Sequence, residues 1–248
     1  MAIPLKIGFS GTHILLKYCH GVLSPSPFSR LLATTLGNDL AGNALAINRA
    51  IDLGSGSGIQ GILLAKLGVH EVYSVDIDSR CVAATEFNAL LNGVSEWASA
   101  SNIVYAHLGD LFDPLGNVKA DLIVCNPPSL PMSDETPRFA CGGRYPQEFL
   151  DRLIASSCEM LTDQGNLVFV ISSLVGLRRT QGKLAEYGFE HKILSRKTEK
   201  FREFYYPHIS YYRRSQLEGV ANFRSLPNGE LEETLYVIKA TRTRPVNG

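Results

Sequence analysis

Three residues at the end of an apolar run have the types and spacing of a binding loop. Asn126, Pro127 and Pro128 directly follow residues 120–125, Ala-Asp-Leu-Ile-Val-Cys, a pattern typical of a buried strand. Proline rings fix the backbone angle φ, so they would hold the asparagine amide in one place beside a ligand. The same prolines could simply end a strand, so other residues must decide between the two interpretations.

A glycine-rich segment upstream has the composition of a ligand-binding turn. Residues 50–53 predict a short strand, and Gly54, Gly56 and Gly58 lead from it into residues 59–67, which are apolar at helical spacing. Glycines at such a junction allow a tight turn and a close approach of a ligand to the backbone, beside the positive end of a helix. The segment also contains G-x-G-x-x-G, so a nicotinamide or flavin site is an alternative at this point.

Acidic residues follow two further predicted strands. Asp76 follows the second strand, 20 residues after Gly56, where a carboxylate that binds ribose would lie. Asp110 and Leu111 follow the third strand, expected at residues 103–107. Asp76 could instead cap the next helix, and Asp110 could begin a turn.

The order of these motifs resembles that of the class I S-adenosylmethionine methyltransferases. Three segments, residues 22–27, 109–115 and 121–131, look like those of the HemK-type protein-glutamine methyltransferases and related N-methyltransferases, and the likeness covers about residues 20–195. Dehydrogenases have no reason to carry the Asn-Pro-Pro element. The resemblance implies S-adenosyl-L-methionine as the cofactor and a reaction that needs no metal.

The resemblance implies a role for each cofactor-binding residue. The glycine turn would run alongside the methionine portion of the cofactor. Asp52, beneath the turn, would hold either the turn or the amino group of the cofactor. Asp76 would accept hydrogen bonds from both ribose hydroxyls, Asp110 would bind the adenine amine, and Leu111 would pack on the adenine ring. The full expected set is Asp52, Gly54, Gly56, Gly58, Asp76, Asp110, Leu111 and Asn126.

The resemblance also implies two catalytic groups and reveals one departure from the family. The side-chain oxygen of Asn126 and the backbone carbonyl of Pro127 would orient a planar nitrogen of the substrate toward the methyl group. The family pattern continues with an aromatic residue that stacks on the acceptor, whereas this chain has Ser129. Either another aromatic, such as Phe139, Tyr145 or one from residues 201–212, supplies this face, or the acceptor is not flat.

The composition indicates one enzyme domain without a strong attraction to nucleic acid or membranes. The 248 residues are 45% hydrophobic, and 24 basic side chains balance 24 acidic ones, so no net charge attracts an anionic partner. The five cysteines are scattered and form no C-x-x-C pair, which argues against a disulfide framework or a zinc site. With no leader-like N-terminus and no apolar run of membrane-spanning length, we expect a cytoplasmic protein.

Strand-like and helix-like runs alternate along the chain, which is typical of a parallel sheet with crossover helices. We expect an α/β, Rossmann-like, doubly wound and mostly parallel seven-stranded sheet whose last strand is antiparallel. Residues 1–45 would form a short, partly helical extension that caps the pocket, and residues 46–248 the methyltransferase domain. Asn88 and Asn92 are expected at exposed positions near the end of a helix.

Residues 199–233 form an insertion in which aromatic and basic side chains interleave before the closing strand. This composition suits RNA binding, but an insertion packed by its own aromatics, or a lid or wall of the acceptor pocket, explains it as well. The acceptor therefore stays open among a protein side-chain nitrogen, an RNA base amine and a small-molecule amine. A nonenzymatic adaptor that only binds adenosylmethionine is a further alternative.

Overall fold

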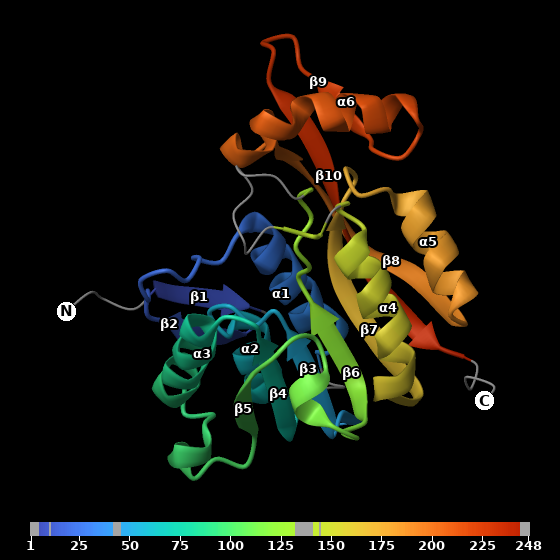
Figure 1. Ribbon diagram of the computed structural model, residues 1–248. Coiled ribbons are helices and arrows are strands. Elements are labelled where there is room, and N and C mark those ends of the chain that lie inside the picture. Colours follow the sequence, from blue (N-terminus) through green and yellow to red (C-terminus); the bar gives the residue numbers. More distant parts are fainter. Residues whose placement is uncertain (1–4, 10, 42–45, 132–140, 144, 244–248) are drawn as a thin grey trace.

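The computed structural model describes residues 5–9, 11–41, 46–131, 141–143 and 145–243. A single large sheet runs through the molecule with the strand order β5-β4-β3-β6-β7-β10-β8, and a short β9 pairs with β10 (Figure 1). The bounds of these strands are β3 Arg49–Leu53, β4 Glu71–Asp76, β5 Ile103–Leu108, β6 Ala120–Cys125, β7 Leu161–Ser172, β8 Phe189–Lys200, β9 Phe223–Ser225 and β10 Leu231–Arg242.

The directions of the strands confirm the predicted doubly wound sheet. Neighbouring strands from β5 to β7 are parallel, whereas β10 runs antiparallel to both β7 and β8. Because β10 opposes both of its neighbours, β7 and β8 run in the same direction as the parallel strands. The carboxyl ends of β5, β4, β3, β6, β7 and β8 therefore meet at one edge of the sheet, where ligands bind in folds of this kind.

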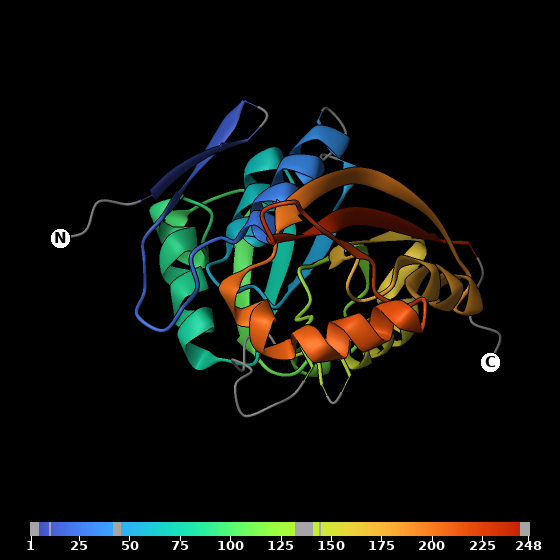
Figure 2. The ribbon, with the colours of Figure 1, turned by 90° about the horizontal axis from the view of Figure 1, so that it is seen from above.

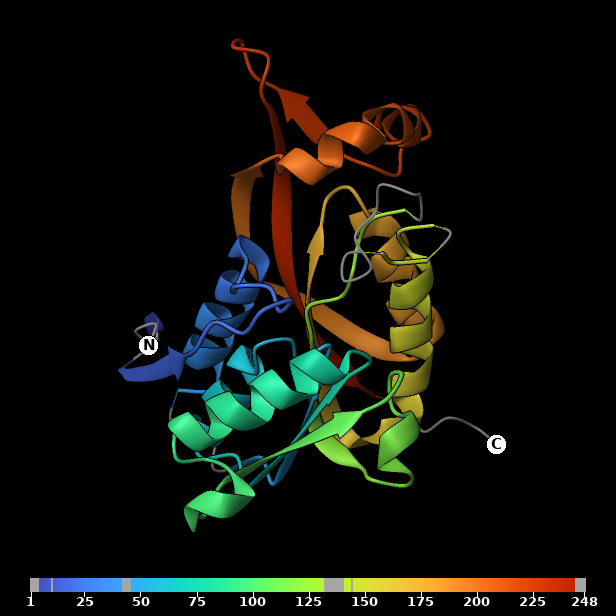
Figure 3. The same ribbon diagram turned by 60° about the vertical axis from the view of Figure 1, so that its left-hand side comes forward.

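Helices cover both faces of the sheet (Figures 2 and 3). Along each strand, alternate apolar residues enter two separate hydrophobic clusters, one containing residues of α1 and α2 and the other residues of α4 and α5. The helices are α1 Pro27–Asp39, α2 Ile59–Leu67, α3 Ser79–Leu91, α4 Glu148–Met160, α5 Leu177–Glu186 and α6 Ile209–Leu217, with short 3₁₀ helices η2 Glu96–Ala98, η3 Asp113–Leu115 and η5 Glu203–His208.

The N-terminal residues contain a hairpin that the sequence did not predict. Strands β1, Leu5–Phe9, and β2, Thr12–Leu16, pair antiparallel and pack against the cluster that holds α1 and α2. Two asparagines of α3 attach this hairpin to the domain. Asn88 accepts a hydrogen bond from the Lys17 amide at 2.8 Å, and Asn92 exchanges two bonds with the backbone of Leu15 at 2.9 and 2.7 Å.

The expectation that Asn88 and Asn92 are exposed is therefore wrong. Asn88 is fully buried and also donates to the Ser57 carbonyl at 3.0 Å, while Asn92 is half-buried. A buried amide is stable only when its polar atoms are paired, and both partners here lie far away in the sequence. The helical periodicity of α3 gave no sign of them, because polar side chains are the usual mark of a solvated face.

The segment between β8 and β10 is a packed structure rather than an open loop. It contains η5, α6 and β9 and lies beyond the carboxyl-end edge of the sheet (Figures 1 and 3). Phe201 packs against Tyr205, Tyr212 and Phe223, with ring centroids 5.2 to 6.3 Å apart. The interpretation in which the insertion is packed by its own aromatics agrees with this arrangement.

In the described part of the chain, no helix combines the length and apolar character needed to cross a membrane. A search of the same residues finds no group of three or more His, Cys, Asp or Glu side chains placed to hold a metal ion.

Candidate active site

A cavity of about 560 Å³ lies at the carboxyl ends of the strands. This volume falls in the range of small-molecule and cofactor sites. Seven of the residues predicted from the sequence line it together: Gly54, Gly56, Asp76, Asp110, Leu111, Asn126 and Pro127. The two other predicted residues do not line the cavity: Asp52 is buried at the end of β3, and Gly58 is the last glycine of the turn.

The glycine turn connects β3 to α2 in a backbone conformation that side chains disfavour. Gly54, Gly56 and Gly58 have φ angles of 69°, 55° and 81°, all in the left-handed region. No atom lies within 4 Å of the place that a Cβ of Gly54 would take, so this part of the turn is open. A Cβ at Gly58 would instead lie 3.2 Å from Thr85, which shows that this glycine allows close packing between the turn and α3.

Asp52 supports the turn from inside the domain. Its carboxylate is 2% exposed and accepts a hydrogen bond from the Gly61 amide of α2 at 3.0 Å. Burial raises the pKa of Asp52 from its ordinary value to about 7. This bond ties the end of β3 to α2, the helix that directly follows the glycine turn.

Asp76 stands at the end of β4 with both carboxylate oxygens engaged by the backbone. One oxygen accepts from the Gly56 amide and the other from the Asp78 amide, each at 2.9 Å. The helix cap that was an alternative role for Asp76 belongs to Asp78, whose side chain accepts from the Arg80 amide. Asp76 is thus fixed against the glycine turn while its half-buried carboxylate lines the cavity.

Asp110 and Leu111 follow β5 and line the same cavity as Asp76. Asp110 forms an ion pair with Arg152 of α4, with 2.5 Å between the two atoms, and its carbonyl accepts from the Asp113 amide at 3.1 Å. Asp110 therefore also begins a turn, as the alternative interpretation expected. Leu111 has a φ of 48°, a conformation that costs a nonglycine residue about 1–3 kcal/mol and that often occurs at functional sites.

Asn126 is held by the N-terminal helix. Its amide nitrogen donates to the Ser29 hydroxyl at 3.1 Å, and the Ser29 amide in turn donates to the capping hydroxyl of Ser26 at 3.2 Å. With its nitrogen engaged by α1, the asparagine amide has one orientation, and its oxygen is on the side away from Ser29. Pro127, Pro128 and Ser129 follow along the wall of the cavity.

The cavity has further residues besides these seven. Pro25 lines the cavity, whereas Pro27 is the first residue of α1 and does not. The cavity wall also includes Ser29, Arg152, Arg202, Phe204 and Tyr205. The helical pattern near Ser29 and the aromatic and basic pattern after residue 199 were visible in the sequence, but neither specifies a contact with the Asn-Pro-Pro loop.

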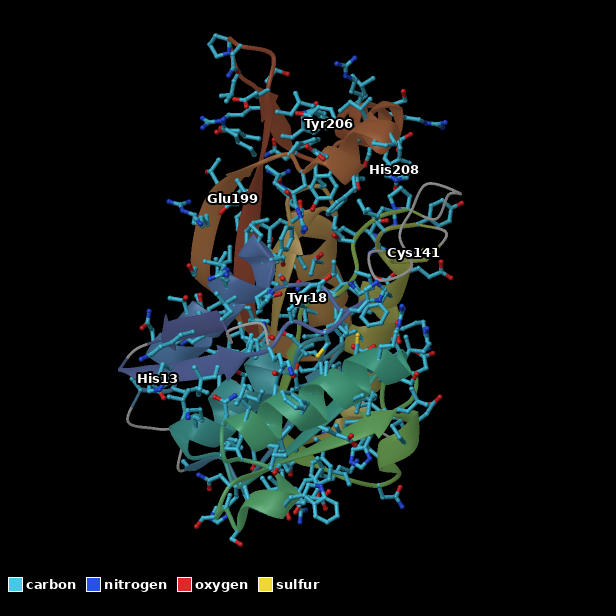
Figure 4. All side chains as sticks on the ribbon, turned by 90° about the vertical axis from the view of Figure 1, so that its left-hand side faces the viewer. His13, Tyr18, Cys141, Glu199, Tyr206 and His208 are labelled. Atoms are coloured by element: carbon cyan, nitrogen blue, oxygen red, sulfur yellow. The ribbon has the colours of Figure 1, made fainter. Side chains whose placement is uncertain are left out.

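The candidates for the aromatic face that Ser129 lacks differ in whether they line the cavity. Phe139 lies outside the described residues, and Tyr145 is exposed and does not line the cavity. Phe204 and Tyr205 come from the segment between β8 and α6 and do line it. Figure 4 marks this segment by Glu199 near the end of β8 and by Tyr206 and His208 in η5.

Comparison with known protein families identifies the fold and its chemistry. Residues 18–202 match the family model described as "Methyltransferase small domain". A putative protein N5-glutamine methyltransferase of Methanocaldococcus jannaschii is 34% identical over 159 residues, which is 62% of this chain and 76% of the relative. Ribosomal RNA small subunit methyltransferase C of Vibrio cholerae is 28% identical over 200 residues, covering 79% of this chain but only 50% of that protein.

A third relative and two solved structures extend this result. The ribosomal protein L11 methyltransferase of Prochlorococcus marinus is 32% identical over 126 residues, half of this chain and 41% of the relative. The T. thermophilus 16S rRNA methyltransferase RsmC, solved with AdoMet and guanosine, has a TM-score of 0.59 at 15% identity and covers 98% of this chain and 51% of its own. The E. cuniculi Mtq2-Trm112 structure has a TM-score of 0.57 at 19% identity and covers 90% and 99%.

These matches confirm the predicted methyltransferase fold, and structural likeness at such low identity shows the fold alone. The family match and the M. jannaschii relative cover enough of both chains to establish membership. The dinucleotide alternative is thereby set aside, and so is the nonenzymatic adaptor, because the family consists of methyltransferases. The chain belongs to the methyltransferase small domain family of S-adenosylmethionine-dependent enzymes, with a class I fold of the HemK and RsmC type.

Proposed function

We propose that this enzyme methylates an amide or amine nitrogen of a protein side chain or of a small molecule. The observation that carries the proposal is the orientation of Asn126, whose amide nitrogen donates to Ser29 while the residue lines the same cavity as Asp76. An amide fixed in this way presents its oxygen as an acceptor for the N–H group of a substrate. The glutamine methyltransferase named among the relatives supports an amide acceptor.

The residues at the ends of β3, β4 and β5 fit the cofactor. The open space at Gly54 leaves room for the methionine portion, the Asp76 carboxylate would accept from the ribose hydroxyls, and Asp110 with Leu111 would bind the adenine ring. Asp52 would contribute indirectly by holding α2, and Gly58 by letting the turn pack on α3. When bound, S-adenosylmethionine supplies a methyl group whose bond to sulfur breaks as the acceptor nitrogen takes the methyl, the electron pair remaining on sulfur.

Residues on the acceptor side of the cavity would orient the substrate nitrogen. The Asn126 oxygen and the Pro127 carbonyl would accept hydrogen bonds from the substrate nitrogen, which aligns its lone pair and stabilises the positive charge that develops on it. The nitrogen then loses its proton to water. Residues 1–45 would contribute through α1, which positions Asn126, and the segment 199–233 through its cavity residues. This mechanism calls for no metal.

An RNA base is the second candidate acceptor. The observation in its favour is that Arg202, Phe204 and Tyr205, from the aromatic and basic segment, line the cavity. Relatives named ribosomal RNA methyltransferases point the same way. Binding that depends on phosphate contacts weakens steeply with salt, so RNA that fails to bind at low salt would remove this candidate.

We also propose a cytoplasmic location. All five cysteines are free thiols, including the buried Cys125 and Cys158, which is the usual state in a reducing compartment.

The test of the proposed function is to incubate the enzyme with methyl-labelled adenosylmethionine and a lysate separated into protein, RNA and small-molecule fractions. We expect the label in the protein or small-molecule fraction, on a nitrogen identified by mass spectrometry of the digested product. Label in RNA would favour the second candidate. Label on oxygen, carbon or sulfur would contradict N-methylation altogether.

A further inference from the structure

We propose that the methyl acceptor carries a carboxylate or phosphate close to the nitrogen that is methylated, and that Arg202 binds this anionic group. In the same proposal, Phe204 supplies the flat face that Ser129 lacks. Arg202, Phe204 and Tyr205 are called the acceptor wall below. The inference rests on the proposed N-methyl transfer and names the class of substrate for it.

The strand order places the acceptor wall on the correct side of Asn126. Along the carboxyl edge of the sheet, Asp110 follows β5, Asp76 ends β4, the glycine turn follows β3 and Asn126 follows β6. Arg202 follows β8, two strands beyond β7 in the same direction along this edge. Asn126 therefore lies between the expected cofactor residues and the acceptor wall, and all of them line one cavity.

The acceptor wall presents a planar cation stacked on an aromatic ring. The guanidinium carbon of Arg202 lies 4.3 Å from the centroid of the Phe204 ring, and Tyr205 meets the same ring edge-on at 4.9 Å and 83°. A guanidinium above a ring leaves the N–H groups at its own edge available, and these donate to carboxylate or phosphate oxygens in pairs. Such a pair of side chains can therefore hold a flat group and an anion side by side.

The wall is anchored in the core, so its geometry is fixed before a substrate binds. The Phe201 amide donates to the Leu231 carbonyl at 2.7 Å, and the Tyr205 amide donates to the Arg202 carbonyl at 2.9 Å. Tyr205 is 2% exposed and packs edge-on against Phe201, with centroids 5.5 Å apart. A rigid wall loses little conformational entropy on binding, as a specificity site requires.

The charges around the cavity distinguish Arg202 from its other arginines. Arg80 pairs with Asp78, and Arg152 pairs with Asp110, each at 2.5 Å. Within the described part of the chain, the Arg202 side chain forms no ion pair with a carboxylate, and its guanidinium lies over the Phe204 ring. The charge of Arg202 acts on the buried Glu233, but burial raises the pKa of Glu233 to about 7, so this carboxyl carries only part of a negative charge at neutral pH.

The first experiment measures binding of two matched pairs of probes to the enzyme saturated with S-adenosylhomocysteine. One pair is N-acetylglutamine, with a free carboxylate, and its neutral carboxamide; the other is guanosine 5′-monophosphate and guanosine. By calorimetry, we expect the anionic member of one pair to bind about tenfold more tightly than its neutral analogue. The pair that shows this preference distinguishes a carboxylate from a phosphate.

Arg202→Gln should abolish the preference, whereas Arg213→Gln, on the exposed surface of α6, should preserve it. The proposal for Arg202 is overturned if neither pair shows a preference, whether its members bind equally or not at all. It is equally overturned if Arg202→Gln leaves the preference unchanged.

The second experiment tests the flat face by rescue. Phe204→Ala should weaken binding of the preferred probe about tenfold, in the range measured for base and aromatic stacking. Adding Ser129→Tyr to Phe204→Ala should restore most of that loss. Tyr206→Ala is the matched control, because Tyr206 lies in the same 3₁₀ helix but is exposed and does not line the cavity (Figure 4).

Unchanged binding by Phe204→Ala, or an equal loss in Tyr206→Ala, would overturn the stacking role. Failure of this inference and failure of the proposed function are distinguishable. Label on nitrogen without any anionic preference would refute the inference alone. An anionic preference with label on an atom other than nitrogen would refute the proposed function alone.

Discussion

The two halves of the cavity are built in different ways. The half that we propose for the cofactor, called the cofactor half, consists of the glycine turn, Asp76 and Asp110, each at the end of a neighbouring parallel strand. The acceptor half combines Asn126 with Ser29 of α1 and with the acceptor wall from the segment after β8. One half is assembled by the sheet itself, and the other by segments that meet only in the folded chain.

Each half also has a buried carboxyl group behind it. Asp52 supports the glycine turn through Gly61, and Glu233 accepts from Ser172 beneath Tyr205 of the acceptor wall. Burial raises the pKa of both groups to about 7. The group behind the cofactor half joins β3 to α2, whereas the group behind the acceptor half joins β10 to β7.

The largest expected effect lies in the cofactor half. Asp76→Ala should weaken adenosylmethionine binding by about 10²–10⁴-fold, because two hydrogen bonds to a carboxylate are lost at about 1.5–3 kcal/mol each. Calorimetry measures the affinity, and thermal unfolding checks that the domain remains folded.

Asp113→Ala is the control for this variant, since Asp113 is an exposed residue of η3 outside the cavity. An affinity of Asp76→Ala within twofold of the control would remove Asp76 from the cofactor site.

A smaller effect is expected where α1 meets the acceptor half. Ser29→Ala removes the hydrogen bond to Asn126 and should lower the methyl-transfer rate by about 2–10-fold, which corresponds to one neutral hydrogen bond. Ser29→Thr keeps the hydroxyl and should restore most of the rate, while adenosylmethionine affinity stays unchanged in both variants. A rate that Thr fails to restore would mean that Ser29 acts by packing rather than through its hydroxyl.

The third expected effect is on the stability of the protein and concerns Glu233, the buried carboxyl group behind the acceptor half. Between about pH 4.5 and 7 the folded protein keeps a proton on Glu233 that the unfolded chain releases, so the free energy of unfolding should fall as pH rises through this range. Glu233→Gln removes this titration and should reduce the fall by about 1 kcal/mol or more. Urea unfolding at pH 5, 6, 7 and 8 measures it.

Asp52 titrates in both proteins, so its contribution cancels in the difference between wild type and Glu233→Gln. Parallel stability curves for the two proteins would show that Glu233 does not titrate in this range.

The positions of Gly54, Asp76 and Asp110 at the ends of strands could be predicted from the sequence because their signals are local. A strand, the residue at its end and the helix after it are neighbours along the chain, so Gly54, Asp76 and Asp110 could be placed from hydrophobic periodicity and turn chemistry. The structure brings these residues to one cavity, as the sheet topology required.

The acceptor half was predicted only in part, because its contacts join distant residues. Asn126 was identified from its prolines, but its partner Ser29 lies 97 residues away. The same limit hid the hairpin β1–β2, which is attached through Asn88 of α3 and Asn92 at its C-terminal end, both more than 70 residues away. No local pattern records such pairings, since a polar residue on a helix has the same spacing whether it is buried or solvated.

The most direct test of the division between the halves is Asn126→Ala, measured for cofactor affinity and for single-turnover methyl transfer to the fraction that accepts the label. We predict adenosylmethionine affinity within about twofold of wild type and a transfer rate lower by about 10²-fold, the usual cost of losing one preorganised polar contact in a transition state. A transfer rate near that of wild type, with the cofactor bound normally, would contradict the role of Asn126 in orienting the acceptor.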